Sequence, residues 1–220
     1  SEWEVVLKRP TKTVDDIEDT VNQIFAEVKA KGDTAVAKYT DMFDGIKLEN
    51  TLVTSEEIAT AEAEISEELK SAILLAKKNI EKFHAAQKTT KVEIETTSGV
   101  KCWQEKRPIQ KIGLYIPGGS APLFSTILML AVPAEIAGCK EIVLCTPPNK
   151  EGKVHPAILY TANLCGVTKI NKIGGIQAIA ALTFGTETVP KVYKIFGPGN
   201  QFVTVAKQLA TRHNVSIDMP

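Results

Sequence analysis

A regular alternation in the second half of the chain constrains the fold more than any other feature of the sequence. Apolar runs typical of buried strands are separated by stretches in which apolar residues recur at helical spacing. The predicted strands are 111–116, 141–146, 169–174, 191–196 and 215–219, and the predicted helices are 124–138, 155–166, 176–185 and 200–213. This pattern predicts an α/β fold, with a Rossmann-like, mostly parallel sheet and helices on both faces.

The first half of the chain has a different texture. Apolar residues at helical spacing from Val14 to Val28 predict a helix, and a second one is expected from Asp33 to about Phe43. Thr54 and Ser66 are candidate N-caps of two more helices. Alternation of apolar and polar residues between Val92 and Cys102 predicts a hairpin. Because no other strands precede residue 108, this half resembles part of a domain. We place the boundary near Arg107-Pro108, giving domains of 1–112 and 113–220.

Three predicted strands end in glycine-bearing turns that lead into helices. The turns are Pro117-Gly118-Gly119, Gly174-Gly175 and Gly197-Pro198-Gly199-Asn200. The carboxyl ends of parallel strands share one edge of a sheet, so the turns should lie together and offer free N–H groups to a phosphate or another polar ligand. Glycine also serves tight turns that bind nothing. Neither the phosphate-loop nor the dinucleotide fingerprint is matched in full, because the Lys-Ser/Thr ending is missing and Phe202 stands where the last glycine belongs.

Composition excludes several classes of protein. The chain has 26 Lys/Arg and 26 Asp/Glu, so its net charge gives no argument for nucleic-acid binding. Its longest apolar run is the eight residues 127–134, too short for a membrane span. The sequence opens on no export leader and its cysteines form no CxxC pair, so we expect reduced, buried thiols in a cytoplasmic protein. The cysteines are Cys102, Cys139, Cys145 and Cys165.

The glycine turns belong to longer stretches that together resemble the histidinol dehydrogenase family. These stretches are GLYIPGGSAPLFSTILMLAVPA, EIVLCTPP, KIGGIQAIAALTFGTETVPKV and KIFGPGNQFVTVAK, with KAKGDTAVAKYTDMFD and AKKNIEKFHAAQK before them. The resemblance covers essentially the whole chain, and its motifs stand in the family's order.

The resemblance implies an activity and a set of cofactors. The family oxidises L-histidinol to L-histidine through an aldehyde, using two NAD+ and one zinc per active site, as a cytoplasmic homodimer. It implies that Tyr115, Gln177 and Asn200 contact NAD. Amide side chains suit ribose hydroxyls and a carboxamide, and Tyr115 offers a flat face with a polar tip. From local sequence alone, Asn200 is as well explained as a helix cap, Gln177 as a surface residue and Tyr115 as a strand residue.

The resemblance also implies that the zinc ligands, the Glu-His acid/base pair and the histidinol-binding residues lie beyond Pro220. It further implies that later chain completes the first domain. His84, His155 and His213 have no metal-site spacing and are expected to be exposed or capping, so we expect no catalytic residue or metal ligand among the 220 residues. A phosphate-transferring enzyme and a non-catalytic module that binds a nucleotide or a partner remain as alternatives.

Overall fold

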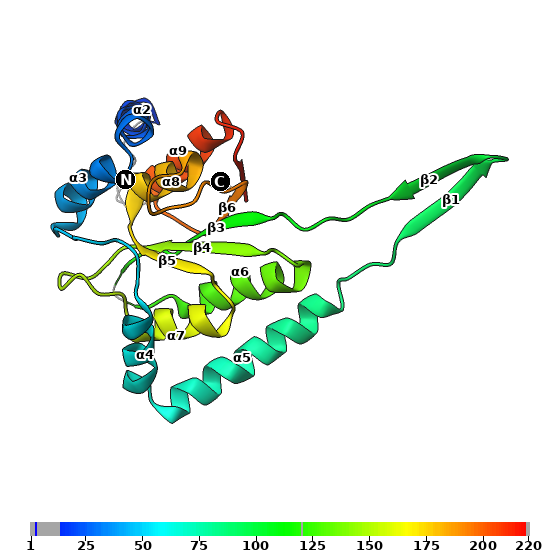
Figure 1. The fold of residues 1–220 in the computed structure, drawn as a ribbon, viewed down its shortest axis with the longest axis horizontal. Coiled ribbons are helices and arrows are strands. Elements are labelled where there is room, and N and C mark those ends of the chain that lie inside the picture. Colours follow the sequence, from blue (N-terminus) through cyan, green and yellow to red (C-terminus); the bar gives the residue numbers. More distant parts are fainter. Residues whose placement is uncertain (1–2, 4–13, 120, 219–220) are drawn as a thin grey trace.

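The computed structural model describes residue 3, residues 14–119 and residues 121–218. Its centre is a five-stranded parallel sheet in the order β5-β4-β3-β6-β7. The strands are β3 (Lys111–Tyr115), β4 (Glu141–Thr146), β5 (Lys169–Lys172), β6 (Lys194–Phe196) and β7 (Ser216–Ile217). The predicted α/β class and parallel sheet are confirmed (Figure 1).

Helices cover both faces of this sheet. One layer contains α2 (Val14–Lys31), α3 (Asp33–Asp44), α8 (Gly175–Phe184) and α9 (Gln201–Thr211). The other contains α4 (Ser55–Glu64), α5 (Glu67–Ala85), α6 (Phe124–Ala137) and α7 (Pro156–Leu164). In Figure 1 the first layer lies above the strands and the second below.

Strand β4 shows how the sequence builds this three-layer arrangement. Ile142 and Leu144 belong to the core shared with α6 and α7, whereas Val143 and Cys145 belong to the core shared with α8 and α9. Successive side chains of a strand point to opposite faces, so a continuous apolar run is what a strand needs when helices cover both of its faces.

The helices of the first half pack onto the second half. Ile17, Val21 and Ile24 of α2 are buried in one core with α8 and α9, and α3 also packs on α8. On the opposite layer α4 packs on α7, and α5 on α6. The apolar faces of α2 and α3 are therefore already covered by the parallel-sheet unit. The division at 112/113 stays a prediction, and it falls inside β3, which begins at Lys111.

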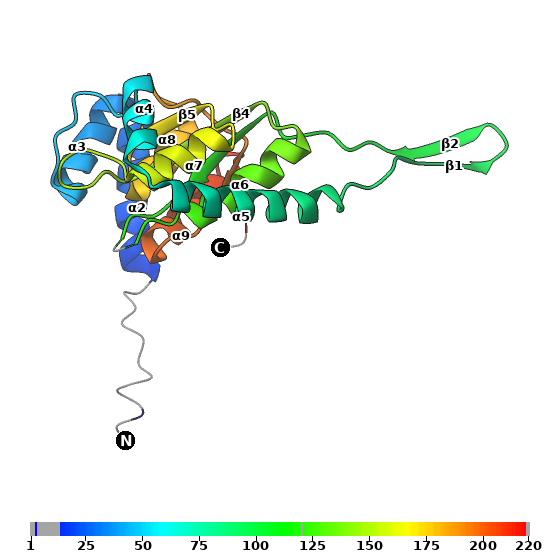
Figure 2. The same cartoon turned by 90° about the horizontal axis from the view of Figure 1, so that it is seen from below.

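The predicted hairpin is formed by β1 (Val92–Thr97) and β2 (Val100–Gln104). Every residue of both strands is exposed. Figures 1 and 2 both show the hairpin extending away from the body of the molecule, beyond the end of α5. Alternation predicted the pairing correctly, but no side of the ribbon is buried in this structure.

Some predicted details differ from the structure. Within the predicted strand 191–196, only Lys194–Phe196 forms a strand. Val192 is buried, and its N–H donates to the Leu182 carbonyl oxygen of α8 instead of to a neighbouring strand. Met219 of the run 215–219 lies outside the described residues. Cys145 and Cys165 are buried free thiols as expected, but Cys102 is exposed on the hairpin and Cys139 is half-buried. Among the described helices, none combines the length and apolarity that crossing a membrane requires.

Candidate functional site

The strand order reverses between β3 and β6. The chain runs outward from β3 through β4 to β5, then returns to the other side of β3 as β6. A crevice forms outside the carboxyl ends of the strands at such a switch point, and ligands of doubly wound folds bind there. Here the three glycine turns follow β3, β5 and β6, all parallel, so they share that edge as predicted.

A cavity of about 560 Å³ lies at this edge, and all three residues singled out from the sequence line it. Its wall also includes residues from all three turns and from two prolines after β4. The lining residues are Thr20, Phe43, Asp44, Tyr115, Pro117, Gly118, Pro147, Pro148, Gly175, Ile176, Gln177, Asn200 and Phe202.

Tyr115 ends β3 and points its hydroxyl toward the neighbouring turn. Its Oη accepts a hydrogen bond of 3.0 Å from the Gly175 N–H. Burial raises the pKa of Tyr115 to about 12, and the nearby negative charge of Asp44 acts in the same direction. The phenol is therefore neutral at any physiological pH, with its proton available to an acceptor in the cavity.

Gln177 lies in the first turn of α8 and is fully buried. Neither its Nε2 nor its Oε1 has a hydrogen-bond partner among the described residues. An unsatisfied buried amide costs free energy, so each one calls for an explanation. Asn171 shares this state but lines neither of the two cavities described here. Gln177 faces a cavity, where a ligand can satisfy it.

Asn200 is the N-cap of α9. Its Oδ1 accepts a hydrogen bond of 3.1 Å from the Val203 N–H, as expected of an N-cap side chain. The local explanation of this residue is thus correct, and it leaves the Nδ2 donor at the cavity wall. The same side chain can cap the helix with one atom and contact a ligand with the other.

The glycines of the turns allow the backbone segments to touch one another. Gly197 has φ +129°, and a Cβ atom there would overlap the carbonyl oxygen of Tyr115. Cβ atoms at Gly118 and at Gly174 would each lie 2.6 Å from the side chain of Pro147. The first two turns therefore both pack on Pro147, and the third packs on the backbone at the end of β3.

A partly buried ion pair holds the third turn in place. Lys207 of α9 is 3% exposed and pairs with Asp218 after β7. The Lys207 Nζ also donates to the Gly197 carbonyl oxygen at 2.9 Å, and the Gly197 N–H donates to Asp218 Oδ2 at 2.7 Å. Both backbone groups of Gly197 are therefore bound by charged partners, which make the stronger hydrogen bonds.

Sequence reasoning missed the part of the site that comes from the first half of the chain. Thr20 of α2 and Phe43 and Asp44 of α3 form one side of the cavity. Phe43 is half exposed, and Asp44 has a buried Oδ2 without a partner among the described residues. Both lie near the end of an amphipathic helix, where no local pattern distinguishes a site residue from a surface residue.

The histidines lie apart from the site. His155 caps α7 by accepting from the Ala157 N–H, and the Nδ1 of His84 bonds to Gln87. His213, which was expected to be exposed or capping, packs on the rings of Phe25 and Phe184, and burial lowers its pKa. Within 14–119 and 121–218, no group of three or more His, Cys, Asp or Glu side chains could hold a metal ion.

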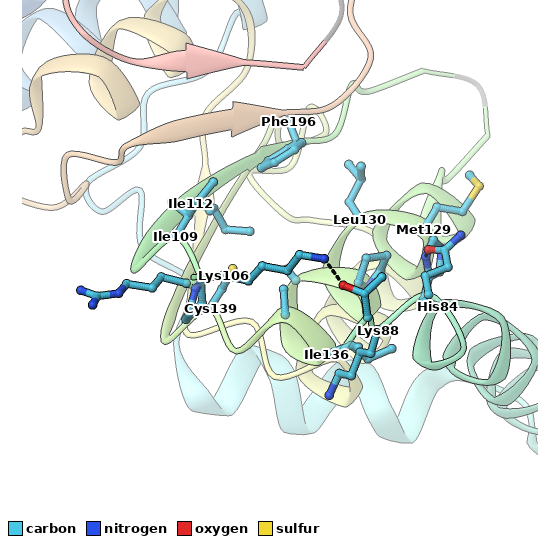
Figure 3. A pocket seen from close by; sticks show the side chains of 17 residues that line it. His84, Lys88, Lys106, Ile109, Ile112, Met129, Leu130, Ile136, Cys139 and Phe196 are labelled. Atoms are coloured by element: carbon cyan, nitrogen blue, oxygen red, sulfur yellow. Dashed lines mark hydrogen bonds between the residues drawn. The ribbon is translucent and has the colours of Figure 1, made fainter. Parts of the chain in front are cut away.

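A second cavity, of about 880 Å³, lies against α6 and the connections to the hairpin. Figure 3 shows apolar side chains such as Ile109, Ile112 and Leu130 around it, with Phe196 above and Lys106 hydrogen-bonded across it to Thr89. Its size exceeds that of the first cavity, but it lacks the glycine turns and the unpartnered amide. We therefore take the cavity at the switch point as the functional site.

Fold and candidate site together define a Rossmann-like α/β protein with a cavity at the switch point of its sheet. The family model of histidinol dehydrogenase matches residues 7–220. The chain belongs to the histidinol dehydrogenase family.

Individual relatives agree with this assignment. A histidinol dehydrogenase of Bacteroides thetaiotaomicron is 61% identical over 219 residues, covering 100% of this chain and 51% of the relative. That of Escherichia coli K12 is 54% identical and covers 98% of this chain and 49% of the relative. The crystal structure of histidinol dehydrogenase from Elizabethkingia anophelis matches with a TM-score of 0.93 at 57% identity, over 100% of this chain and 51% of that one. The chain thus spans about half the length of these relatives.

Proposed function

We propose that this chain is the dinucleotide-binding part of an NAD-dependent enzyme that oxidises L-histidinol to L-histidine through an aldehyde intermediate. Membership of the family supports the reaction, because the relatives that match the whole chain are histidinol dehydrogenases. The observation that carries the cofactor assignment is Gln177, whose amide is buried at the switch-point cavity with neither polar atom partnered.

The residues present suit a nicotinamide dinucleotide. Gln177 can donate and accept at once, as a ribose diol or a carboxamide requires, and Asn200 adds a donor. The cavity faces the amino-terminal ends of α8 and α9. Free N–H groups and the positive end of the helix dipole favour phosphate oxygens there. When bound, NAD+ supplies the acceptor for the hydride that leaves the alcohol carbon.

The chain's own residues would act by binding and orientation. Tyr115 is held by the Gly175 N–H, and the turn at Gly197 is fixed by Lys207 and Asp218. A wall of this kind needs no rearrangement when a ligand arrives, so less binding energy is lost in ordering side chains. Ile176 and Phe202 add apolar surface to the same cavity, against which a flat ring of the dinucleotide could pack.

The rest of the chemistry is assigned to chain beyond this sequence. We place the zinc ligands, the acid/base pair and the histidinol-binding residues there, and we propose a cytoplasmic homodimer. Hydride can leave an alcohol carbon only as a base takes the hydroxyl proton, and a metal can hold and polarise the alcohol oxygen. The described residues around the cavity supply binding groups for the dinucleotide and leave these two tasks to other residues.

Gln177→Met in the full-length protein tests the cofactor assignment. Methionine has a similar volume and no hydrogen-bonding amide, so folding should be unharmed or improved once an unsatisfied buried group is gone. NAD+ affinity, measured by titration calorimetry, should fall about tenfold or more. Thr183→Val is the matched control, because Thr183 is a buried polar residue of the same helix whose hydroxyl bonds to the Ile179 carbonyl oxygen, away from the cavity.

Unchanged NAD+ affinity in Gln177→Met would overturn the site. A full-length protein that binds NAD+ but produces no NADH from histidinol would favour the alternative of a non-catalytic binding module. Phosphoryl transfer is less well supported by the site, because no Lys or Arg occurs among the described residues that line the cavity.

A further inference from the structure

Asp44 is an acid in an unfavourable position. It is the last residue of α3, where the helix dipole favours a cation rather than an anion. Its Oδ2 is buried and has no hydrogen-bond partner, and no ion pair to Asp44 occurs among the described residues. Burial raises the pKa of this carboxyl group.

No described residue that lines the cavity around Asp44 carries a positive charge to offset its carboxylate. The described lining of the cavity contains no Lys or Arg, and the charged group interacts with Tyr115, whose pKa it helps to raise. A carboxylate with a buried, unpartnered oxygen lowers the stability of a fold, so its presence at the wall of a cavity is explained by a ligand that provides hydrogen-bond donors.

We propose that Asp44 accepts hydrogen bonds from the 2′- and 3′-hydroxyl groups of the adenosine ribose and thereby selects the dinucleotide that lacks a 2′-phosphate. The proposal rests on the proposed function, since it assigns a role within the same cavity. It gives the first half of the chain a part in cofactor choice, because Asp44 reaches the site from α3 and not from the sheet.

The selectivity follows from charge. A ribose diol presents two O–H donors, which is what an unpartnered carboxylate lacks. A 2′-phosphate would bring a second negative group to the same place, with no cation among the described lining residues to offset the repulsion. In Rossmann sites generally, an acid binds the ribose 2′-hydroxyl where NAD is used, and an Arg accommodates the 2′-phosphate where NADP is used.

The test measures binding of NAD+ and of NADP+ to the full-length protein by titration calorimetry, separately from activity. The wild type should bind NAD+ at least about tenfold more tightly than NADP+, and Asp44→Asn should reduce that ratio about tenfold by weakening NAD+ and relieving the repulsion of NADP+. Asp41→Asn is the control. It removes one negative charge three residues earlier in α3, where the carboxylate lies 3.9 Å from Lys47 and away from the cavity.

Each outcome decides the matter. A ratio that falls in Asp44→Asn but not in Asp41→Asn supports the proposal. Equal weakening of both dinucleotides would overturn it, since the contact would then lie at the nicotinamide ribose. An unchanged ratio would overturn it while NAD+ binding itself upholds the proposed function. Absence of NAD+ binding in the wild type would overturn both the role proposed for Asp44 and the proposed function. Asp44→Ser is a second variant without the carboxylate and should show the same reduced ratio. Thermal unfolding of both variants checks that each is folded.

Discussion

Asn200 shows how one side chain can satisfy two demands. Its Oδ1 caps α9 through the Val203 N–H, which accounts for an asparagine at this place without any ligand. The Nδ2 group of the same amide remains at the wall of the cavity. Truncation to alanine would therefore remove the helix cap together with the proposed ligand contact, and that variant alone could not separate the two effects.

Two substitutions separate these roles. Asn200→Ala should lower the free energy of unfolding by about 1 kcal/mol through the lost cap. It should also weaken NAD+ binding by about 1–3 kcal/mol through the lost contact. Asn200→Ser keeps a capping oxygen but no amide, so stability should hold while NAD+ affinity falls. Thermal unfolding and calorimetric titration measure the two effects. If Asn200→Ser binds NAD+ as the wild type does, Asn200 is a cap and nothing more.

The raised pKa of Asp44 should make the free energy of unfolding fall as the pH rises. Burial raises the pKa of the folded state above that of the unfolded chain, so the folded protein binds the proton more tightly. Stability from this group is fully present below the unfolded pKa and is lost as pH rises through the folded pKa. Asp44→Asn should therefore melt at a higher temperature than the wild type at pH 7, and the difference should shrink in acid. A variant that melts lower at pH 7 would show that the carboxylate has a stabilising partner.

Three candidate site residues could be predicted from the sequence because the stretches that carry them resemble the histidinol dehydrogenase family. Tyr115, Gln177 and Asn200 all line the switch-point cavity. Their roles toward NAD stay a prediction. Phe43 and Asp44 were missed for a physical reason, since they reach the site through packing of α3 on α8, a contact more than 100 residues apart that no local pattern encodes.

At the scale of elements, the turn after β6 is the most constrained part of the site. Gly197 stands where any side chain would overlap the backbone of Tyr115, and its own N–H and carbonyl groups are bound by Asp218 and Lys207. The turn is therefore positioned by strand β3 on one side and by helix α9 on the other.

Gly197→Ala should lower the free energy of unfolding by about 3 kcal/mol or more, through strain at positive φ and the overlap with Tyr115. NAD+ binding should fall as well, because the turn would move. Gly166→Ala is the control: φ there is +68°, and nothing lies within 4 Å of an added Cβ atom, so the backbone penalty of about 1 kcal/mol acts alone. Chemical denaturation of both variants measures the difference. Equal losses would mean that the Gly197 turn relaxes freely.

Elements were predictable where local pattern and burial coincide. The run 141–146 became β4 residue for residue, because both faces of that strand are buried. Thr54 forms the predicted capping box with Glu57. Prediction failed around Val192, whose apolar character reflects packing below α8 rather than strand pairing, and no sequence pattern distinguishes these two causes of burial.

At the scale of the whole molecule, the first half is part of the sheet unit through α2, α3 and α4. It was expected to be an incomplete domain that waits for later chain. That expectation stays a prediction. In this structure the buried apolar residues of α2 and α3 share one core with α8 and α9, a long-range packing that the order of the sequence does not reveal. Exposed apolar side chains of the first half include Met42 and Phe43 on α3 and Leu74, Leu75 and Phe83 on α5.

The 220-residue polypeptide alone should be inactive toward histidinol and should hold no stoichiometric zinc, because we assign the base and the metal ligands to chain beyond it. Metal analysis and an NADH absorbance assay with histidinol measure both properties. The full-length protein is the positive control and should oxidise histidinol. One bound zinc per chain together with turnover by the 220 residues would show that the active site has been misplaced.

The hairpin has a further consequence for the chain as a substrate of proteases. Its strands pair with each other in a sheet of their own, and every residue in them is open to solvent. Trypsin should cut first after Lys91, Lys101 or Lys106, which lie in this arm or at its base. Because the parallel sheet contains no strand from the arm, the two resulting pieces should stay associated through α5 and α6 and separate only on denaturation.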